Sequence, residues 1–207
     1  AAYLAINEIQ KLGSANWALV AIEIVVAIVL FVVFWNVEKR QKAPMVTTHY
    51  LKQRRTWGLL LTTLLTMTGV FAIMNGIVPA LAQDTEVGAG MSASVVSFAT
   101  LTPYALIGLA FGPVAGVLAS KFGYCAVLRT GLIVSVVAIL FGIYVCNVPS
   151  IWALVVMSLV LGVSYAGTAN IMLNGLGIVL SPEDNPGYLP GLNSGAFNLG
   201  AGLSYAV

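Results

Sequence analysis

The chain has 207 residues, of which 59% are hydrophobic and 8% are charged, and its formal net charge at pH 7 is +2. A typical soluble domain is about 25% charged, so the composition excludes a chain surrounded by water and indicates one surrounded by lipid. The weak net charge also argues against a nucleic-acid partner.

Six apolar segments follow one another along the chain, and each approaches or exceeds the roughly 20 residues that a helix needs to cross about 30 Å of hydrocarbon. They span residues 17–35, 57–82, 91–119, 128–146, 151–180 and 189–207. Because the runs are long and do not alternate with polar residues, we expect helices and not strands. The predicted fold is therefore all-α, a polytopic transmembrane helix bundle.

Both ends of the chain fall in apolar sequence. Residues 1–6 have the composition of the end of a preceding helix, and 189–207 stops without a polar flank, which predicts a truncated last helix and a piece of a longer protein. The alternative is a complete small membrane protein. We divide the chain into 1–56, with the first spanning segment and a basic connection, and 57–207, with the other five segments.

The basic connection 36–56 sets the predicted topology. Cytoplasmic loops collect Lys and Arg, and this connection contains six of them: Lys39, Arg40, Lys42, Lys52, Arg54 and Arg55. Alternation of the segments then places Lys121 and Arg129 in the cytoplasm as well. We expect a multi-pass protein of the plasma (inner) membrane with 36–56 on the cytoplasmic side.

Small residues and cysteines give two further expectations. Gly108, Gly112 and Gly116 recur every four residues, so a neighbouring helix can approach this stripe closely. Cys125 and Cys146 lie near opposite ends of one predicted helix, which separates them too far for a disulfide.

The turn after the third segment carries the run Gly116-Val117-Leu118-Ala119-Ser120-Lys121-Phe122-Gly123. It resembles the short cytoplasmic loop motif of the major facilitator superfamily, G-x-L-A-D-R-F-G-R-K-x-x-L. Ser120 replaces the usual Asp, and only Lys121 keeps a charge. The resemblance implies that Gly116, Ser120, Lys121 and Gly123 help to hold one conformation, although more weakly than in the family. Alternatively, Gly123 simply ends the helix, since Gly suits a C-cap.

Three other stretches are similar to the fourteen-helix drug:proton antiporters of that superfamily. They are Val37-Glu38-Lys39-Arg40 with Ala43-Pro44-Met45, Thr102-Pro103-Tyr104 leading to 112–116, and 187–193 with Gly200 and Gly202. The resemblance implies the C-terminal part of a major facilitator fold, from the end of the seventh helix into the thirteenth. It also implies a substrate cavity between two bundles, alternating access and, as a missing partner, the N-terminal bundle of the same protein.

Uncharged polar side chains within the segments are the candidates for lining that cavity. Asn170 and Asn174 are four residues apart and share one helix face. The other candidates are Asn75, Tyr104, Tyr165, Asn193 and Asn198. Because membrane helices also use such residues for hydrogen bonds to one another, interhelical bonding is the alternative for each.

Glu23 is the one charge inside the first segment. A carboxylate in a low dielectric can take up a proton near neutral pH, so Glu23 is a candidate for proton coupling. Alternatively, it reaches the membrane surface or pairs with a neighbouring helix.

The sequence lacks signatures of an enzyme. His49 is the only histidine, no Cys/His cluster suggests zinc or haem, and there is no nucleotide-binding P-loop, so we expect no cofactor and no metal. The predicted function is proton-coupled export of small amphipathic or drug-like molecules by a secondary transporter. An uptake permease on the same fold and a non-transporting subunit of a larger complex are the alternatives. The expected partners are a small-molecule substrate, protons and membrane lipids.

Overall fold

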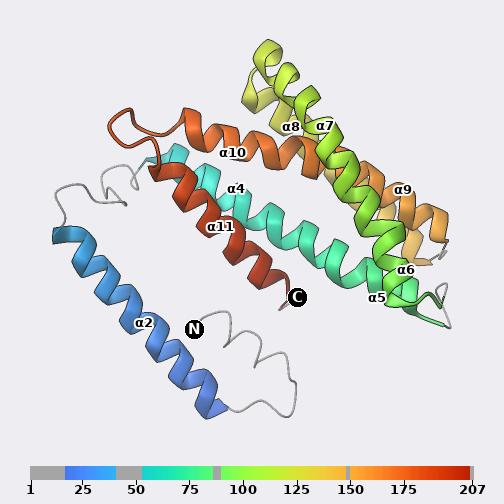
Figure 1. Cartoon of the computed structure of the whole chain (residues 1–207), viewed down its shortest axis with the longest axis horizontal. Helices are drawn as coiled ribbons and strands as arrows, with labels where there is room; N and C mark the ends of the chain where they lie inside the picture. The colour runs from blue at the N-terminus through green and yellow to red at the C-terminus, as the bar shows by residue number, and fades with distance from the viewer. Residues whose placement is uncertain (1–16, 41–52, 86–89, 148–149, 206–207) are drawn as a thin grey trace. The chain divides into compact units, whose positions relative to one another are not determined.

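The computed structural model describes residues 17–40, 53–85, 90–147 and 150–205. All regular elements in these ranges are helices (Figure 1), which confirms the predicted all-α fold. Five helical runs are long and apolar enough to cross a membrane: Trp17–Val37, Arg54–Gln83, Ala93–Phe122, Tyr124–Tyr144 and Ile151–Val179. The chain forms two compact units, one of Ala1–Gly69 with Leu180–Val207 and the other of Val70–Val179. The predicted division at residue 56 stays a prediction.

The first unit contains α2 (Trp17–Arg40), most of α4 (Arg54–Phe71) and α11 (Tyr188–Ser204). α2 carries apolar side chains on all of its faces, and many of them are exposed. Ile22 and Phe31, for example, are 58% and 63% exposed, as expected for a helix in contact with lipid. α4 and α11 pack closely. An added Cβ at Gly200 of α11 would lie 2.6 Å from the carbonyl oxygen of Leu64 in α4.

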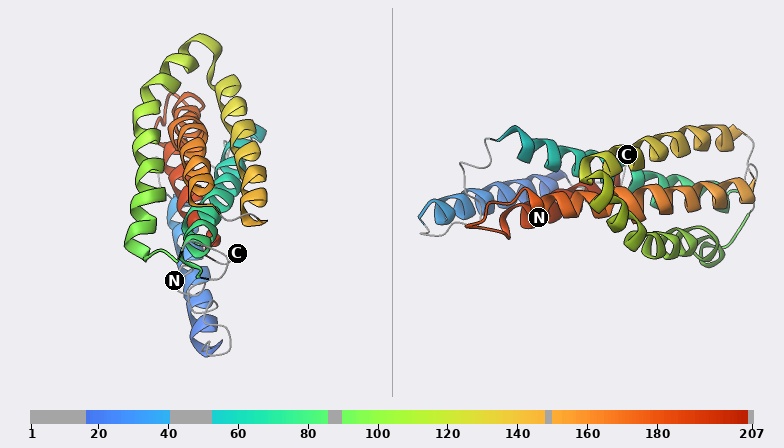
Figure 2. Two further views of the ribbon diagram at one scale, coloured as in Figure 1. Left: turned by 90° about the vertical axis from the view of Figure 1, so that its right-hand side faces the viewer. Right: turned by 90° about the horizontal axis from the view of Figure 1, so that it is seen from above.

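Three long helical runs lie wholly or partly in the second unit, and a π-helical segment interrupts each of them. The first run continues from α4 through η1 (Ala72–Ile77) into α5 (Val78–Gln83), and the next comprises α6 (Ala93–Val96), η2 (Ser97–Leu101) and α7 (Thr102–Phe122). The last comprises α9 (Ile151–Leu161), η3 (Gly162–Ala169) and α10 (Asn170–Val179), which form one continuous rod in Figure 1 and in the right-hand view of Figure 2. α8 (Tyr124–Asn147) is α-helical throughout.

Proline explains two of the three π segments. A helical Pro donates no hydrogen bond, and its ring clashes with the carbonyl four residues earlier. Pro79 follows η1 and Pro103 follows η2, and the carbonyls four residues before them belong to Asn75 and Ala99, inside the two wider segments. η3 contains no Pro. In η3 the Thr168 hydroxyl donates to the carbonyl of Val163, five residues earlier, at 2.8 Å.

A single residue connects α7 to α8. α7 ends at Phe122, α8 begins at Tyr124, and Gly123 between them has φ +83° and ψ 150°. Its N–H donates to the carbonyl of Ala119 at 2.9 Å, and its own carbonyl accepts the N–H of Val127 at 3.3 Å. Gly123 thus caps one helix and starts the next.

Candidate functional site

η3 is held between α7 and α8 by close contacts at glycines. A Cβ added to Gly167 of η3 would lie 2.8 Å from the carbonyl oxygen of Gly108 and 2.9 Å from the Cβ of Phe111, both on α7. On the α8 side, a Cβ at Gly131 would lie 2.8 Å from the carbonyl oxygen of Ser164. The backbone of η3 therefore lies directly against the backbone of α7 on one side and against that of α8 on the other.

The predicted glycine stripe of α7 is only partly used in this packing. Gly108 and Gly112 are buried, against η3 and against Ile171 of α10 respectively. Gly116, the third member, has no neighbouring atom within 4 Å of an added Cβ. The close approach predicted from the sequence therefore covers two of the three positions.

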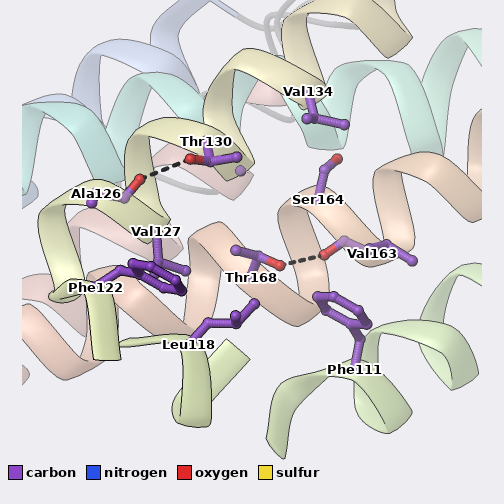
Figure 3. A pocket seen from close by; sticks show the side chains of 11 residues that line it. Phe111, Leu118, Phe122, Ala126, Val127, Thr130, Val134, Val163, Ser164 and Thr168 are labelled. Atoms are coloured by element: carbon purple, nitrogen blue, oxygen red, sulfur yellow. Dashed lines mark hydrogen bonds between the residues drawn. The ribbon is translucent and has the colours of Figure 1, made fainter. Parts of the chain in front are cut away.

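A cavity of about 460 Å³ lies beside this packed region, between α7, α8 and η3 (Figure 3). Its volume is within the range of roughly 300–1,000 Å³ that is usual for small-molecule sites. α7 and η3 form one part of the wall and α8 forms the other. The lining residues are Phe111, Leu118 and Phe122; Val163, Ser164 and Thr168; and Ala126, Val127, Thr130, Gly131 and Val134.

Three hydroxyl groups are the polar side chains of this lining, and all three already take part in hydrogen bonds. Thr130 donates to the carbonyl of Ala126 at 3.0 Å, and Thr168 donates to Val163, as the dashed lines in Figure 3 show. Ser164 accepts the hydroxyl of Ser135 at 2.9 Å. The hydroxyl protons of Thr130 and Thr168 are thus already donated to backbone carbonyls, and most of the cavity wall offers apolar contact.

None of the seven polar residues predicted to line a substrate cavity lies in this wall. In the second unit, Tyr165 is 2% exposed, Tyr104 and Asn170 are half-buried, and Asn75 and Asn174 are exposed. The structure does bring Asn170 and Asn174 together. The Asn174 amide donates to the Asn170 carbonyl at 2.9 Å and lies 3.3 Å from the Asn170 side-chain oxygen.

The other two predicted residues lie on α11 in the first unit. Asn193 is 1% exposed and accepts the hydroxyl of Thr63 from α4 at 2.6 Å, so it forms the interhelical hydrogen bond that was the alternative to cavity lining. Asn198 is exposed, and its amide donates to the carbonyl of Ser194 one turn earlier at 2.9 Å.

The motif residues lie at the end of α7. The Ser120 hydroxyl donates to the carbonyl of Val117 at 2.8 Å, and Lys121 is exposed in the last turn. Their conformational role stays a prediction. Glu23 of α2 is half-buried, and its Oε2 is a buried atom without a hydrogen-bond partner in the described part of the chain. Its role in proton coupling also stays a prediction.

The sequence did not reveal the cavity, although one signal for it was present. Ser164 and Thr168 are four residues apart on one helix face. Thr130, the third hydroxyl of the lining, follows the cationic Arg129 in the preceding predicted helix. Their convergence depends on the glycine contacts, which bring η3 between α7 and α8. Among the described residues, no group of three His, Cys, Asp or Glu side chains is placed to hold a metal ion.

Comparison with known proteins gives two matches. The family model of the Major Facilitator Superfamily matches residues 9–205. The Uridine/deoxyuridine transporter of Lactococcus lactis subsp. cremoris (strain MG1363) is 60% identical over an alignment 207 residues long, and the alignment covers 98% of this chain. The chain spans 43% of the length of that relative.

Proposed function

Because the chain belongs to the Major Facilitator Superfamily, we propose that the whole protein is a secondary transporter and that its substrate is a pyrimidine nucleoside. The observation that carries the substrate class is the 60% identity to a protein named for uridine and deoxyuridine. The apolar spanning helices identify an integral membrane protein, and the transport activity of the whole protein is our proposal.

A nucleoside substrate favours the uptake permease over the drug exporter that the sequence predicted. Proton-coupled export of amphipathic molecules is the second candidate, and it rests on the similarity of the stretches at 37–45, 102–116 and 187–202 to drug:proton antiporters. The two candidates differ in what they must bind. A nucleoside needs directional hydrogen bonds, whereas an amphipathic drug is held mainly by apolar contact.

Asn170 and Asn174 suit the nucleoside. An asparagine amide has a carbonyl acceptor beside an NH₂ donor, which matches the alternating carbonyl and N–H groups of the uracil edge. These two amides already contact each other on α10. We place them on the substrate path, with the N-terminal bundle of the whole protein supplying the opposite wall.

Uptake of labelled uridine is the first prediction. Proteoliposomes that contain the full-length protein should accumulate uridine when the outside is made acidic, and unlabelled deoxyuridine should compete. Asn174→Ala should raise the KM for uridine about tenfold, because a lost hydrogen bond to a bound ligand costs about 1–1.5 kcal/mol. Asn36→Ala is the matched control, since Asn36 of α2 is also exposed and its amide also donates to a carbonyl one turn earlier. This variant should leave KM within a factor of about two.

The arms of this experiment separate the candidates. Transport of a lipophilic cation without uridine transport would favour drug export. A uridine flux that does not change with the pH gradient would contradict proton coupling. Glu23→Gln tests the carboxylate of α2. If Glu23 is structural, this variant keeps its response to the gradient, and a lost response with intact uridine exchange would assign the coupling proton to Glu23.

The membrane topology gives the second prediction. Cys125 is exposed and follows the α7–α8 turn by two residues, on the side that we propose to be cytoplasmic with 36–56. In a full-length protein that retains Cys125 alone, a membrane-impermeant maleimide should label inverted vesicles and leave intact cells unlabelled. Labelling of intact cells would show that Cys125 faces the outside and would contradict the proposed orientation.

A further inference from the structure

We propose that the cavity between α7, α8 and η3 binds one acyl chain of an anionic phospholipid, whose headgroup lies against Lys121 at the α7–α8 turn and is reached by the side chain of Arg129 from α8. This site is separate from the nucleoside path, and the inference does not rest on the proposed substrate. Four observations carry it: the length of the cavity, its opening, its lining and the two cations beside it.

The cavity runs along the helices for about the depth of one lipid leaflet. On α7 its wall extends from Phe122 at the turn to Phe111, eleven residues earlier, which corresponds to roughly 16 Å at 1.5 Å per residue. Half of a hydrocarbon layer of about 30 Å is about 15 Å. A chain that starts at the turn would therefore reach Phe111 near the middle of the bilayer.

The cavity opens on the surface of the second unit. Phe122 and Val134 in its wall are 67% and 40% exposed, whereas Val127, Ser164 and Thr168 are buried at its base. We take this exposed face to contact the hydrocarbon, so that an acyl chain enters sideways without passing through a water-filled path.

The lining suits a hydrocarbon chain better than a nucleoside. The Thr130 and Thr168 protons are already donated to backbone carbonyls. A nucleoside buried here would leave most of its own polar groups without partners, and unpaired buried polar groups are costly. An acyl chain needs only the apolar contact that Phe111, Leu118 and Val134 provide.

The charge at the turn complements an anionic headgroup. Between Glu86 and Glu183 the chain contains no acidic residue, and its only two formal charges are Lys121 and Arg129. Lys121 directly precedes Phe122 at the turn, and Arg129 directly precedes Thr130, six residues beyond Gly123 on α8. Lys121 thus adjoins the end of the cavity at the turn, and Arg129 adjoins the middle of its α8 wall. Basic groups at the membrane surface attract anionic lipids, and here the acyl chain of such a lipid would have a cavity beside it.

Lipid titration of the purified, delipidated full-length protein tests the proposal, with native mass spectrometry as the readout. Dioleoylphosphatidylglycerol should bind about fivefold more tightly than dioleoylphosphatidylcholine for each cation engaged. Ala126→Phe, which fills the cavity from α8, should weaken phosphatidylglycerol binding about tenfold, because several buried methylenes lose their contacts. Val136→Phe is the matched control on the same helix, since Val136 is 55% exposed and outside the cavity wall.

Further arms separate headgroup from chain. Lys121→Gln should reduce the preference for phosphatidylglycerol and leave phosphatidylcholine binding unchanged, whereas Arg55→Gln, an exposed cation of α4, should change neither. Dihexanoylphosphatidylglycerol, with the same headgroup and short chains, should bind much more weakly than the dioleoyl lipid. Phe122→Ala removes a wall of the cavity and provides a second variant if Ala126→Phe does not fold. Equal lipid binding by the wild type, Ala126→Phe and Phe122→Ala would overturn the proposal.

Discussion

Gly167→Ala is expected to destabilise the second unit by about 3 kcal/mol or more and to abolish transport by the full-length protein, because the added methyl overpacks a contact between two backbones. The new Cβ would lie 2.8 Å from the carbonyl oxygen of Gly108, 2.9 Å from the Cβ of Phe111 and 3.2 Å from the Cα of Gly108. Two of these three atoms belong to the backbone of α7, so no side-chain rotation relieves the clash. η3 and α7 must move apart, and η3 then also loses its position against α8.

Thermal unfolding of the purified full-length protein in detergent measures this effect, with Gly116→Ala as the matched control. Gly116 lies on α7, and an added Cβ there meets nothing within 4 Å. Since Ala favours a helix over Gly by about 1 kcal/mol, Gly116→Ala should leave the unfolding temperature unchanged or raise it. An unfolding temperature for Gly167→Ala equal to that of Gly116→Ala would show that η3 does not pack on α7 through Gly167.

The spanning helices could be predicted from the sequence because their cause is local. A run of apolar residues long enough to cross the bilayer must be helical, since no water is present to satisfy its backbone. The two largest differences in bounds are at α2, which ends at Arg40 and not at 35, and at α8, which begins at Tyr124 and not at 128 as predicted. A connection of one residue was not expected, and the extra residues 124–127 therefore belong to the helix.

The π segments and the cavity could not be predicted because they depend on contacts between helices. Pro79 and Pro103 indicated that helices would be disturbed, but not that the turns before them would widen. η3 has no Pro, and its sequence alone does not indicate a π segment. The contacts that accompany it come from Gly108 on α7 and Gly131 on α8, which are distant in sequence. Asn193 shows the same limit, since its choice between a cavity and a hydrogen bond depends on Thr63 in a distant part of the chain.

The family could be inferred from motifs, whereas the substrate could not. The loop motif around Lys121 belongs to the scaffold that many transporters share, and a fold hosts many functions. Drug export was the expectation from resemblance, and the identity to a uridine/deoxyuridine transporter favours a nucleoside instead. In our proposal, substrate choice rests on a few polar groups such as Asn170 and Asn174, and the residue types alone do not name a ligand.

Gly123→Ala is expected to cost about 1–3 kcal/mol, since residues with a side chain are strained in this part of conformational space. Gly123 has φ +83° and ψ 150° in the single residue between α7 and α8. Its surroundings are open, with no atom within 4 Å of an added Cβ, so the cost arises from the backbone and not from a clash.

Gly187→Ala is the matched control for this substitution. Gly187 also precedes a helix and also has open space around it, but its φ of −81° and ψ of −11° suit any residue. Equilibrium unfolding of the full-length protein in detergent should show a loss of stability for Gly123→Ala and none for Gly187→Ala. Because Phe122 is held by this turn, Gly123→Ala should also weaken phosphatidylglycerol binding at the cavity. If both variants unfold like the wild type, the α7–α8 connection does not require the positive φ of Gly123, and the one-residue turn between these helices is contradicted.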